Sequence, residues 1–298
     1  MFQAHIGEIA ALATALCWTI TAITFESAGK KVGSISVNLI RLIIAFLLIS
    51  IYNLFARGMV LPLDASSSTW IWLSFSGMIG FVIGDLFLFQ AFVEVGSRIS
   101  MLIMSTVPPI TAITGFLIMG ERITPLGLAG MIITILGIAV VILTKNPEDK
   151  RVKLSHPIKG LIYAFIGALG QAFGLVFSKF GMGSYDPFAA TQIRIIAAII
   201  GFSLVITVSK NWGRLFLAFK DKRAIKYISI GSVFGPFIGV SLSLLAVQHA
   251  PTGIVSTITS ITPILIIPVS IIVFKEKIFT KEIFGAIITL IGISLLFI

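Results

Sequence analysis

The stretch MGERITPLGLAGMIITILGI, residues 119–138, returns later in the chain as FKEKIFTKEIFGAIITLIGI, residues 274–293. The same offset of 155 residues, the step from 119 to 274, aligns residues 84–143 with residues 239–298 without a gap. Apolar sequences match by chance at Ile, Leu and Ala, but here less common residues also keep register. These pairs are Gly84 with Gly239, Ser105 with Ser260, Pro108 with Pro263, Gly130 with Gly285, Thr134 with Thr289 and Gly137 with Gly292. The pattern predicts an internal duplication.

The first part of each repeat aligns better with an offset of 153 residues. Ala15 then meets Ala168, and Arg41 meets Arg194. The apolar segment at the N-terminus therefore has a counterpart in the second repeat. It also lacks the basic start and the small-residue cleavage site of a signal peptide. We expect it to remain in the protein as a structural segment.

The composition is that of a membrane protein. Of the 298 residues, 57% are hydrophobic and 11% are charged, and the mean hydropathy is +1.08. A soluble domain usually has about a quarter of its residues charged, and its interior cannot hide this much apolar surface. The short alternating strands of a membrane β-barrel are not found in the sequence. The composition therefore predicts an all-α integral membrane protein.

A helix needs about 20 apolar residues to cross the hydrocarbon core of a bilayer. Ten segments meet this requirement, at residues 5–26, 34–55, 70–92, 97–119, 123–143, 157–180, 187–208, 224–247, 252–274 and 280–298. They divide the chain into a first five-helix repeat at 1–144, a charged linker at 145–156 and a second five-helix repeat at 157–298.

The number of segments in each repeat decides the architecture. Because five is odd, the second repeat must enter the membrane from the opposite side. The sequence therefore predicts ten transmembrane helices arranged as two inverted five-helix repeats. Such repeats are typical of secondary transporters, which expose a site near the membrane midplane to each side in turn. Two other interpretations stay open: a duplication that only enlarges a structural scaffold, and a channel.

The loops carry an uneven distribution of Lys and Arg. Loops that follow the first, third, fifth, seventh and ninth segments hold 17 of these residues, and the loops on the other side hold 3. The positive-inside rule then places both termini outside the cytoplasm of a multi-pass plasma-membrane protein. A tag-accessibility assay that finds both termini in the cytoplasm would overturn this expectation. The net charge of +10 is interpreted as loop charge, with no nucleic-acid partner.

Two sets of repeated motifs resemble a known family. GERITPLGLAG at 120–130 is matched by KEKIFTKEIFG at 275–285, and NLIRLIIAF at 38–46 is matched by TQIRIIAAI at 191–199. With the five-helix duplication, they resemble the drug/metabolite transporter superfamily, EamA type, over the whole chain. The resemblance implies a transporter of small solutes, often an exporter of amino acids or related metabolites, with a central cavity between the halves. Glu121 and Glu276 of the motif are expected to stabilise the start of a helix.

Small residues and prolines recur at equivalent places in the two repeats. The predicted helix-packing residues are Gly80 and Gly84 in the third segment and Gly235 and Gly239 in the eighth. The predicted kink or gating residues are Pro108, Pro109, Pro263 and Pro268. Carbonyl groups freed by a proline need partners inside the protein or in a wet cavity. We therefore expect the fourth and ninth segments to line the cavity, with Ser105 and Ser260 facing a solute, although such hydroxyls also bond their own helix backbone.

Few ionisable residues are expected inside the bilayer, where they mark functional sites. Arg41 lies seven residues after the start of the second segment, and Asp85 lies seven residues before the end of the third. Both positions are therefore ~10 Å from the same membrane surface, and we predict a buried ion pair. Val240 replaces the acid in the second repeat, so the equivalent Arg194 is expected to attract a carboxylate substrate, or else to extend toward the membrane surface. Asp85 either neutralises Arg41 or carries a proton.

Further candidates for substrate binding or coupling are Trp18, Gln90 and Gln171. The three histidines are far apart and the chain has a single Cys, so no metal site and no cofactor are expected. The sequence lacks the phosphate-binding pattern G-x-x-x-x-G-K-[ST] and the hydrolase patterns H-E-x-x-H and G-x-S-x-G. We therefore expect a carrier that is not an enzyme, whose partners are a small-molecule substrate and membrane lipid. Three interpretations of its coupling stay open: to protons, to another solute gradient, or no coupling. A monomer is compatible with these features.

Overall fold

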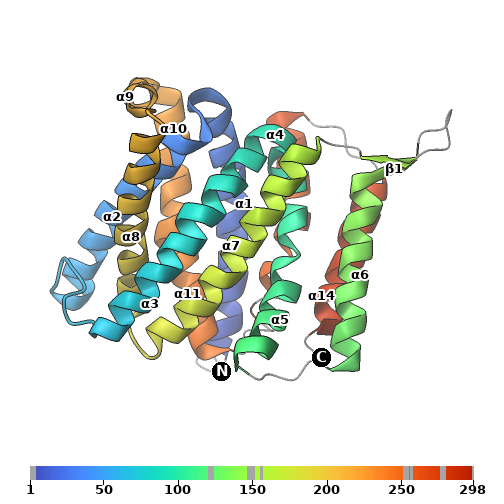
Figure 1. Ribbon diagram of the computed structural model, residues 1–298, viewed down its shortest axis with the longest axis horizontal. Helices are drawn as coiled ribbons and strands as arrows, with labels where there is room; N and C mark the ends of the chain where they lie inside the picture. The colour runs from blue at the N-terminus through green and yellow to red at the C-terminus, as the bar shows by residue number, and fades with distance from the viewer. Residues whose placement is uncertain are drawn as a thin grey trace.

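The computed structural model describes residues 5–119, 124–145, 152–154, 157–250, 255, 258–275 and 280–296. Within these residues the chain forms a bundle of helices that run side by side (Figure 1). Helix α1 begins and helix α14 ends at the same end of the bundle, as an even number of crossings requires. Glu121 and Glu276 lie outside the described residues.

The first repeat contains α1 (Ile6–Val32), α2 (Ser34–Arg57), α3 (Ser67–Gly77), the π-helical segment η2 (Met78–Gly84), α4 (Asp85–Met104), α5 (Val107–Met119) and α6 (Pro125–Ile142). Between the repeats, β1 (Leu143–Lys145) pairs antiparallel with β2 (Val152–Leu154). The second repeat contains α7 (Ile158–Met182), α8 (Pro187–Val208), α9 (Trp212–Lys220), α10 (Lys222–Ser232), the π-helical segment η3 (Val233–Gly239), α11 (Val240–His249), α13 (Thr262–Phe274) and α14 (Thr280–Leu296).

Six helical stretches are long and apolar enough to cross a membrane by length and composition. They correspond to the first, second, third, sixth, seventh and eighth predicted segments. The stretch Ser67–Met104 also contains the start of the fourth segment, after a kink at Gly96. The fifth, ninth and tenth segments are represented by shorter apolar helices in the described part of the chain. Together these helices confirm the all-α membrane fold. The strand pair β1–β2 and the short helix α9 were not predicted, because both lie in connections that read as charged loops.

The contact between α6 and α14 shows how the repeats are related. A Cβ atom added at Gly137 would overlap with Thr289, and one added at Gly292 would overlap with Thr134. The counterparts of Gly137 and Thr289, 155 positions away, are Gly292 and Thr134. The two contacts are therefore equivalent, as a two-fold relation between the repeats requires. Each threonine donates a 2.8 Å hydrogen bond to its own helix, at Gly130 or Gly285. The hydroxyls are thus satisfied, and the helices approach closely.

A second pair of contacts joins the repeats around the middle of the bundle. Gly170 and Gly174 of α7 face Gly84 and Gly80, so backbone packs directly on backbone. The counterpart contact places Gly239 and Gly235 against α1, where the facing residues are Cys17 and Thr21. Each repeat therefore packs its first helix against the third segment of the other repeat. The four predicted packing glycines lie in these two interfaces.

The outer surface of the bundle is apolar. Large side chains such as Leu47, Phe55 and Ile132 are exposed, whereas Thr14, Asn38 and Gln192 are buried. This arrangement reverses the pattern of a soluble protein, since lipid covers the apolar exterior and the polar groups find partners inside. The polar interior defines where a functional site lies.

Substitution at the α6–α14 crossing tests the two-fold relation. Gly137→Leu and Gly292→Leu should each destabilise the protein by about 1–3 kcal/mol, because each added side chain overlaps with a facing threonine. The two effects should be similar, as measured by thermal unfolding of the purified protein in detergent. Leu136→Phe, on the exposed face of α6, serves as the control for added bulk. Two glycine variants as stable as this control would contradict the crossing.

Candidate functional site

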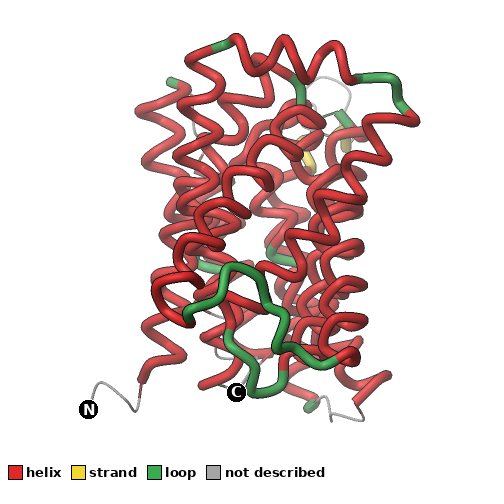
Figure 2. The backbone as a smooth tube through the Cα atoms, turned by 90° about the vertical axis from the view of Figure 1, so that its left-hand side faces the viewer, coloured by secondary structure: helices red, strands yellow, loops and turns green. Residues whose placement is uncertain are grey.

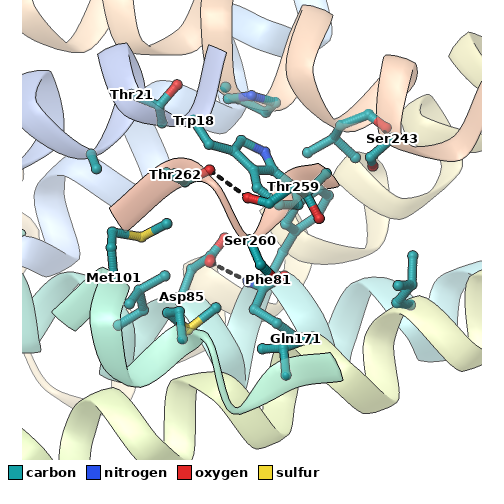
Figure 3. A pocket seen from close by; sticks show the side chains of 18 of the residues that line it. Trp18, Thr21, Phe81, Asp85, Met101, Gln171, Ser243, Thr259, Ser260 and Thr262 are labelled. Atoms are coloured by element: carbon teal, nitrogen blue, oxygen red, sulfur yellow. Dashed lines mark hydrogen bonds between the residues drawn. The ribbon is translucent and has the colours of Figure 1, made fainter. Parts of the chain in front are cut away.

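A cavity of about 160 Å³ lies in the middle of the bundle (Figure 3). Both repeats line it: α1, α2 and α4 contribute from the first, and α7, α8 and α11 from the second. Among the described residues that line the cavity, three are ionisable, and the others are mostly apolar or aromatic. The three are Arg41, Asp85 and Arg194.

Two broken helices meet at this cavity. The fourth predicted segment is interrupted at Ser105 and Thr106, between α4 and α5, and the ninth is interrupted at Ser260 and Ile261. These interruptions are equivalent under the offset of 155. Residues of both lie on the cavity wall, together with Pro108 and Pro263.

The prolines explain why the chain unwinds there. A proline lacks an N–H group and cannot donate to the carbonyl four residues earlier. Pro263 therefore leaves the carbonyl of Thr259 without its helical donor, and the Thr262 hydroxyl donates to that carbonyl instead, at 2.7 Å (Figure 3). Irregular backbone at membrane depth is tolerated where it lines a cavity. Both breaks meet this condition.

The third and eighth segments widen into π-helices, also at equivalent positions. The N–H of Asp85 donates to the carbonyl of Gly80, five residues earlier, and the N–H of Val240 donates to that of Gly235. One extra residue in a turn rotates the following helix by about 100°. The π-helical turns thus set the direction in which residues 85 and 240 point, and both line the cavity. Such turns occur frequently at functional sites.

The predicted ion pair between Arg41 and Asp85 is present. Arg41 Nη2 donates to Asp85 Oδ2, and the two side chains are 3% and 6% exposed. Gln171 Nε2 donates to the other carboxylate oxygen at 2.6 Å. Asn38 accepts from Arg41 Nε at 3.0 Å and donates to the backbone carbonyl of Asp85 at 3.2 Å. The pair is therefore hydrogen-bonded on both sides, as a buried pair requires.

Arg194 approaches the same carboxylate from the second repeat. Its side chain is buried, and it interacts electrostatically with Asp85. Its guanidinium lies 4.6 Å from the centre of the Phe81 ring, and that of Arg41 lies 5.5 Å from the same ring. Among the described residues, none makes a hydrogen bond with Arg194 Nε. We call Arg41, Asp85, Arg194 and Gln171 the charged cluster.

The structure brings most of the predicted site residues together. Trp18, Arg41, Asp85, Ser105, Pro108, Gln171, Arg194, Gly235, Ser260 and Pro263 line the cavity. Pro109, Pro268, Gly80, Gly84 and Gly239 are not among its lining residues, although they lie in the same helices. The roles of all these residues in transport stay predictions.

Gln90 lies elsewhere, in the part of α4 between Asp85 and the kink at Gly96. It accepts a 2.7 Å hydrogen bond from the Ser34 hydroxyl and donates to Glu94 at 3.1 Å. It is not among the residues that line the cavity. The contacts connect α4 with the start of α2, so in the structure Gln90 joins two helices.

The sequence analysis missed Phe81, which lines the cavity, and Asn38, which supports a residue that does. Phe81 lies between two small-residue positions of η2 and contacts both arginines. Asn38 supports Arg41 from one helical turn earlier, a spacing that could have been read from the sequence. Thr259 and Thr262 lie in the ninth segment, which was expected to line the cavity, and only the break in the helix distinguishes them from its other hydroxyl residues.

The described residues include no group of three or more His, Cys, Asp and Glu side chains that could hold a metal ion. The polar groups that line the cavity are guanidinium, carboxylate, amide and hydroxyl groups. Groups of this kind can hold and orient a polar solute by hydrogen bonds and charge.

The repeat architecture, the membrane helices and the central cavity agree with a match to a family model. The EamA-like transporter family matches residues 5–143 and, a second time, residues 158–298. The chain belongs to the EamA-like transporter family. The EamA-like chain is 23% identical to an uncharacterised transporter of Archaeoglobus fulgidus, over 96% of this chain and 95% of the relative. It is 22% identical to an uncharacterised transporter of Synechocystis, over 86% of this chain and 79% of the relative.

A solved crystal structure has the same fold. It aligns with a TM-score of 0.62 at 15% identity, over 97% of this chain and 95% of that chain. The family match and the two relatives named as transporters support the membership of this EamA-like protein in the drug/metabolite transporter superfamily.

A double-mutant cycle tests the ion pair. Arg41→Met and Asp85→Leu should each cost about 3–5 kcal/mol, because each leaves one buried charge without its partner. The double variant should be more stable than either single variant, as measured by thermal unfolding in detergent and by the yield of monodisperse protein. Leu42→Met, a buried change beside Arg41, controls for repacking. Single variants with wild-type yield and stability would show that the pair contributes nothing to folding.

Proposed function

We propose that this EamA-like protein is a secondary transporter that moves small organic solutes with an anionic group across the plasma membrane. Amino acids and related metabolites have such a group, as a carboxylate. Export is the proposed direction, in keeping with the family resemblance of the repeated motifs. The central cavity would open to each side in turn as the inverted halves exchange conformations.

The observation that carries this proposal is the charge imbalance of the cavity. Two buried guanidiniums face one buried carboxylate, so the lining has a formal charge of +1. An uncompensated charge is costly in apolar surroundings, and an anionic group of the solute would relieve that cost. Arg41 is already neutralised by Asp85. Arg194, whose Nε lacks a partner in the described structure, is therefore the proposed contact for the anion.

The rest of the cavity suits a compact organic body. A dry apolar cavity of ~150 Å³ holds benzene, and this cavity measures about 160 Å³. Trp18, Phe81 and Phe89 contribute aromatic surface, and hydroxyls from both breaks supply polar contacts. A solute with a charged head and a small apolar or aromatic part matches this lining.

The matched irregularities in the two repeats support alternating access. The breaks at residues 105–106 and 260–261 and the π-helical segments η2 and η3 lie at equivalent positions beside the cavity. Discontinuous helices of this kind form the substrate sites of inverted-repeat transporters. We propose that each repeat adopts in turn the conformation that the other one leaves.

Asp85 is the proposed coupling residue, and protons are the proposed coupling ion. Its carboxylate either neutralises Arg41 throughout the cycle or accepts a proton when the cavity changes sides. The second role predicts that transport by Asp85→Asn no longer depends on pH. The first role predicts that its pH dependence is unchanged.

The orientation is a further part of the proposal. The end of the bundle that carries α9, β1 and most of the loop Lys and Arg residues is placed in the cytoplasm, with both termini outside. Export would then begin at the α9 end. A monomer is the proposed state, since both repeats of one chain contribute residues that line the cavity.

Transport by the purified protein in proteoliposomes tests the function. A carrier should show saturable counterflow with at least one solute from a panel of amino acids, sugars and organic cations. A channel or a structural scaffold would show none, because counterflow requires that one site serves both directions. Arg194→Gln should lower the counterflow of a carboxylate solute by roughly 10-fold or more, since a charge-assisted hydrogen bond is lost.

The controls separate binding from folding. Arg194→Lys keeps the charge and should retain part of the activity, while Lys159→Gln, at an exposed residue, should retain all of it. All three variants should elute as monodisperse protein at wild-type yield. Unchanged counterflow by Arg194→Gln would remove this residue from the substrate site.

A further inference from the structure

Helix α9 lies across one end of the bundle and does not follow the spanning helices. Figure 1 shows it nearly end-on at the top of the upright bundle, between α8 and α10. In the perpendicular view, Figure 2 shows helix running across the top of the same bundle. A helix perpendicular to the spans at the end of a bundle lies in the plane of the membrane surface.

One side of α9 is fixed to the protein. Leu215 and Ala218 are 3% and 2% exposed, and they belong to the same buried cluster as residues of α1 and α2. The Trp212 indole N–H donates to the Thr207 hydroxyl at 3.1 Å, which connects the helix to the end of α8. The rotation of α9 about its own axis is therefore determined by packing.

The other side of α9 exposes large apolar residues. Phe216, Leu217 and Phe219 are 63%, 65% and 49% exposed. Leu204 and Val208, in the last turns of α8 before the chain enters α9, are also exposed apolar residues. Lipid covers α8 at these positions. The exposed apolar side chains of α9 therefore lie where they contact the acyl boundary of the same bilayer.

Basic side chains lie beside these apolar residues, and Lys220 lies between Phe216 and Leu217 around the helix. Exposed Lys and Arg residues lie on α9, just before it, and in the first turns of α10: Lys210, Arg214, Lys220, Lys222, Arg223 and Lys226. Asp221 is the single acidic residue between 209 and 230, so the segment has a formal charge of +5. Asp221 accepts hydrogen bonds from the N–H groups of Arg223 and Ala224, both at 2.9 Å. The Ala224 hydrogen bond is the main cause of the lowered pKa of Asp221, which stays ionised as the helix cap.

We propose that α9 and the first turns of α10 form a surface site for anionic phospholipids. The Lys and Arg side chains bind the headgroups, and Phe216, Leu217 and Phe219 enter the acyl boundary beneath them. Basic residues beside an interfacial amphipathic helix are attracted to anionic headgroups, and aromatic residues anchor at that depth. The continuity with the lipid-facing side of α8 and the charge complementarity identify a lipid, rather than a second protein, as the occupant.

The site is connected to the cavity through the chain. Helix α8 carries Arg194, and α10 continues directly into η3, whose Gly235 and Pro236 line the cavity. A lipid that holds α9 at the surface therefore restricts the end of α8 and the start of α10, which both lead to residues that line the cavity. The site itself does not depend on the proposed transport activity, since it rests on the surface of the protein.

Lipid selectivity of the full chain in nanodiscs tests the proposal. The protein is placed in nanodiscs of phosphatidylcholine with a minority of phosphatidylglycerol and is then released from them in the gas phase. Native mass spectrometry counts the lipids that stay bound to the protein. The wild type should retain phosphatidylglycerol in preference to phosphatidylcholine. Arg214→Gln/Lys220→Gln should lower this preference by roughly 10-fold or more, since two charges near the headgroups are lost.

Two matched variants make the result specific. Lys159→Gln/Lys275→Gln removes two exposed charges from the same end of the bundle and should leave the preference unchanged. Arg214→Lys/Lys220→Arg keeps the charge on α9 and should also leave it unchanged. Equal lipid preference in the wild type and the Arg214→Gln/Lys220→Gln variant would overturn the proposal. Equal losses in both double charge-removal variants would also overturn it, because they would indicate general surface charge.

Discussion

Arg41 and Asp85 hold opposite charges in contact inside a bundle whose outer surface is apolar. Each charge alone would be costly at that depth, and together they remain acceptable because Asn38 and Gln171 complete their hydrogen bonds. The hydrogen bond from Gln171 to Asp85 also joins the repeats, since Gln171 belongs to α7 of the second repeat and Asp85 to α4 of the first. The packing of these helices, glycine on glycine, brings the amide within reach of the carboxylate.

The site follows from a symmetric scaffold with one asymmetric substitution. Duplication provides two arginines, two π-helical turns and two broken helices at equivalent positions. It does not provide two acids, since Val240 occupies the position equivalent to Asp85. The cavity therefore has one more guanidinium than carboxylate. In our account, this imbalance selects an anionic group, while the symmetry allows the two halves to exchange conformations.

Several features could be predicted from the sequence because they depend on spacing. The membrane segments follow from runs of apolar residues, and the ion pair follows from equal depth in segments that enter from the same side. The contact of Gly137 with Thr289 agrees with the gapless register. The proximity of Arg194 to Asp85 was not predicted, because Arg194 was expected near the opposite membrane surface. Its long side chain extends from Gly77, which faces its backbone, to Gly80.

Other features depend on packing that a periodic pattern does not reveal. The π-helical turns keep the apolar character of an ordinary helix, so η2 and η3 are hidden within the third and eighth segments. The breaks were expected at the prolines, but the chain unwinds two or three residues earlier, at Ser105 and Ser260. Helix α9 was read as a charged loop, since its nine residues are too few to span a bilayer.

The central claim is that Arg194 binds the anionic group of the solute. Thermal unfolding of the purified protein, with increasing amounts of a carboxylate solute or of its neutral amide, measures this directly. The account predicts that the carboxylate raises the unfolding temperature and the amide does not, and that Arg194→Gln abolishes the difference while Lys159→Gln preserves it. Equal stabilisation of the wild type by both compounds would contradict the account.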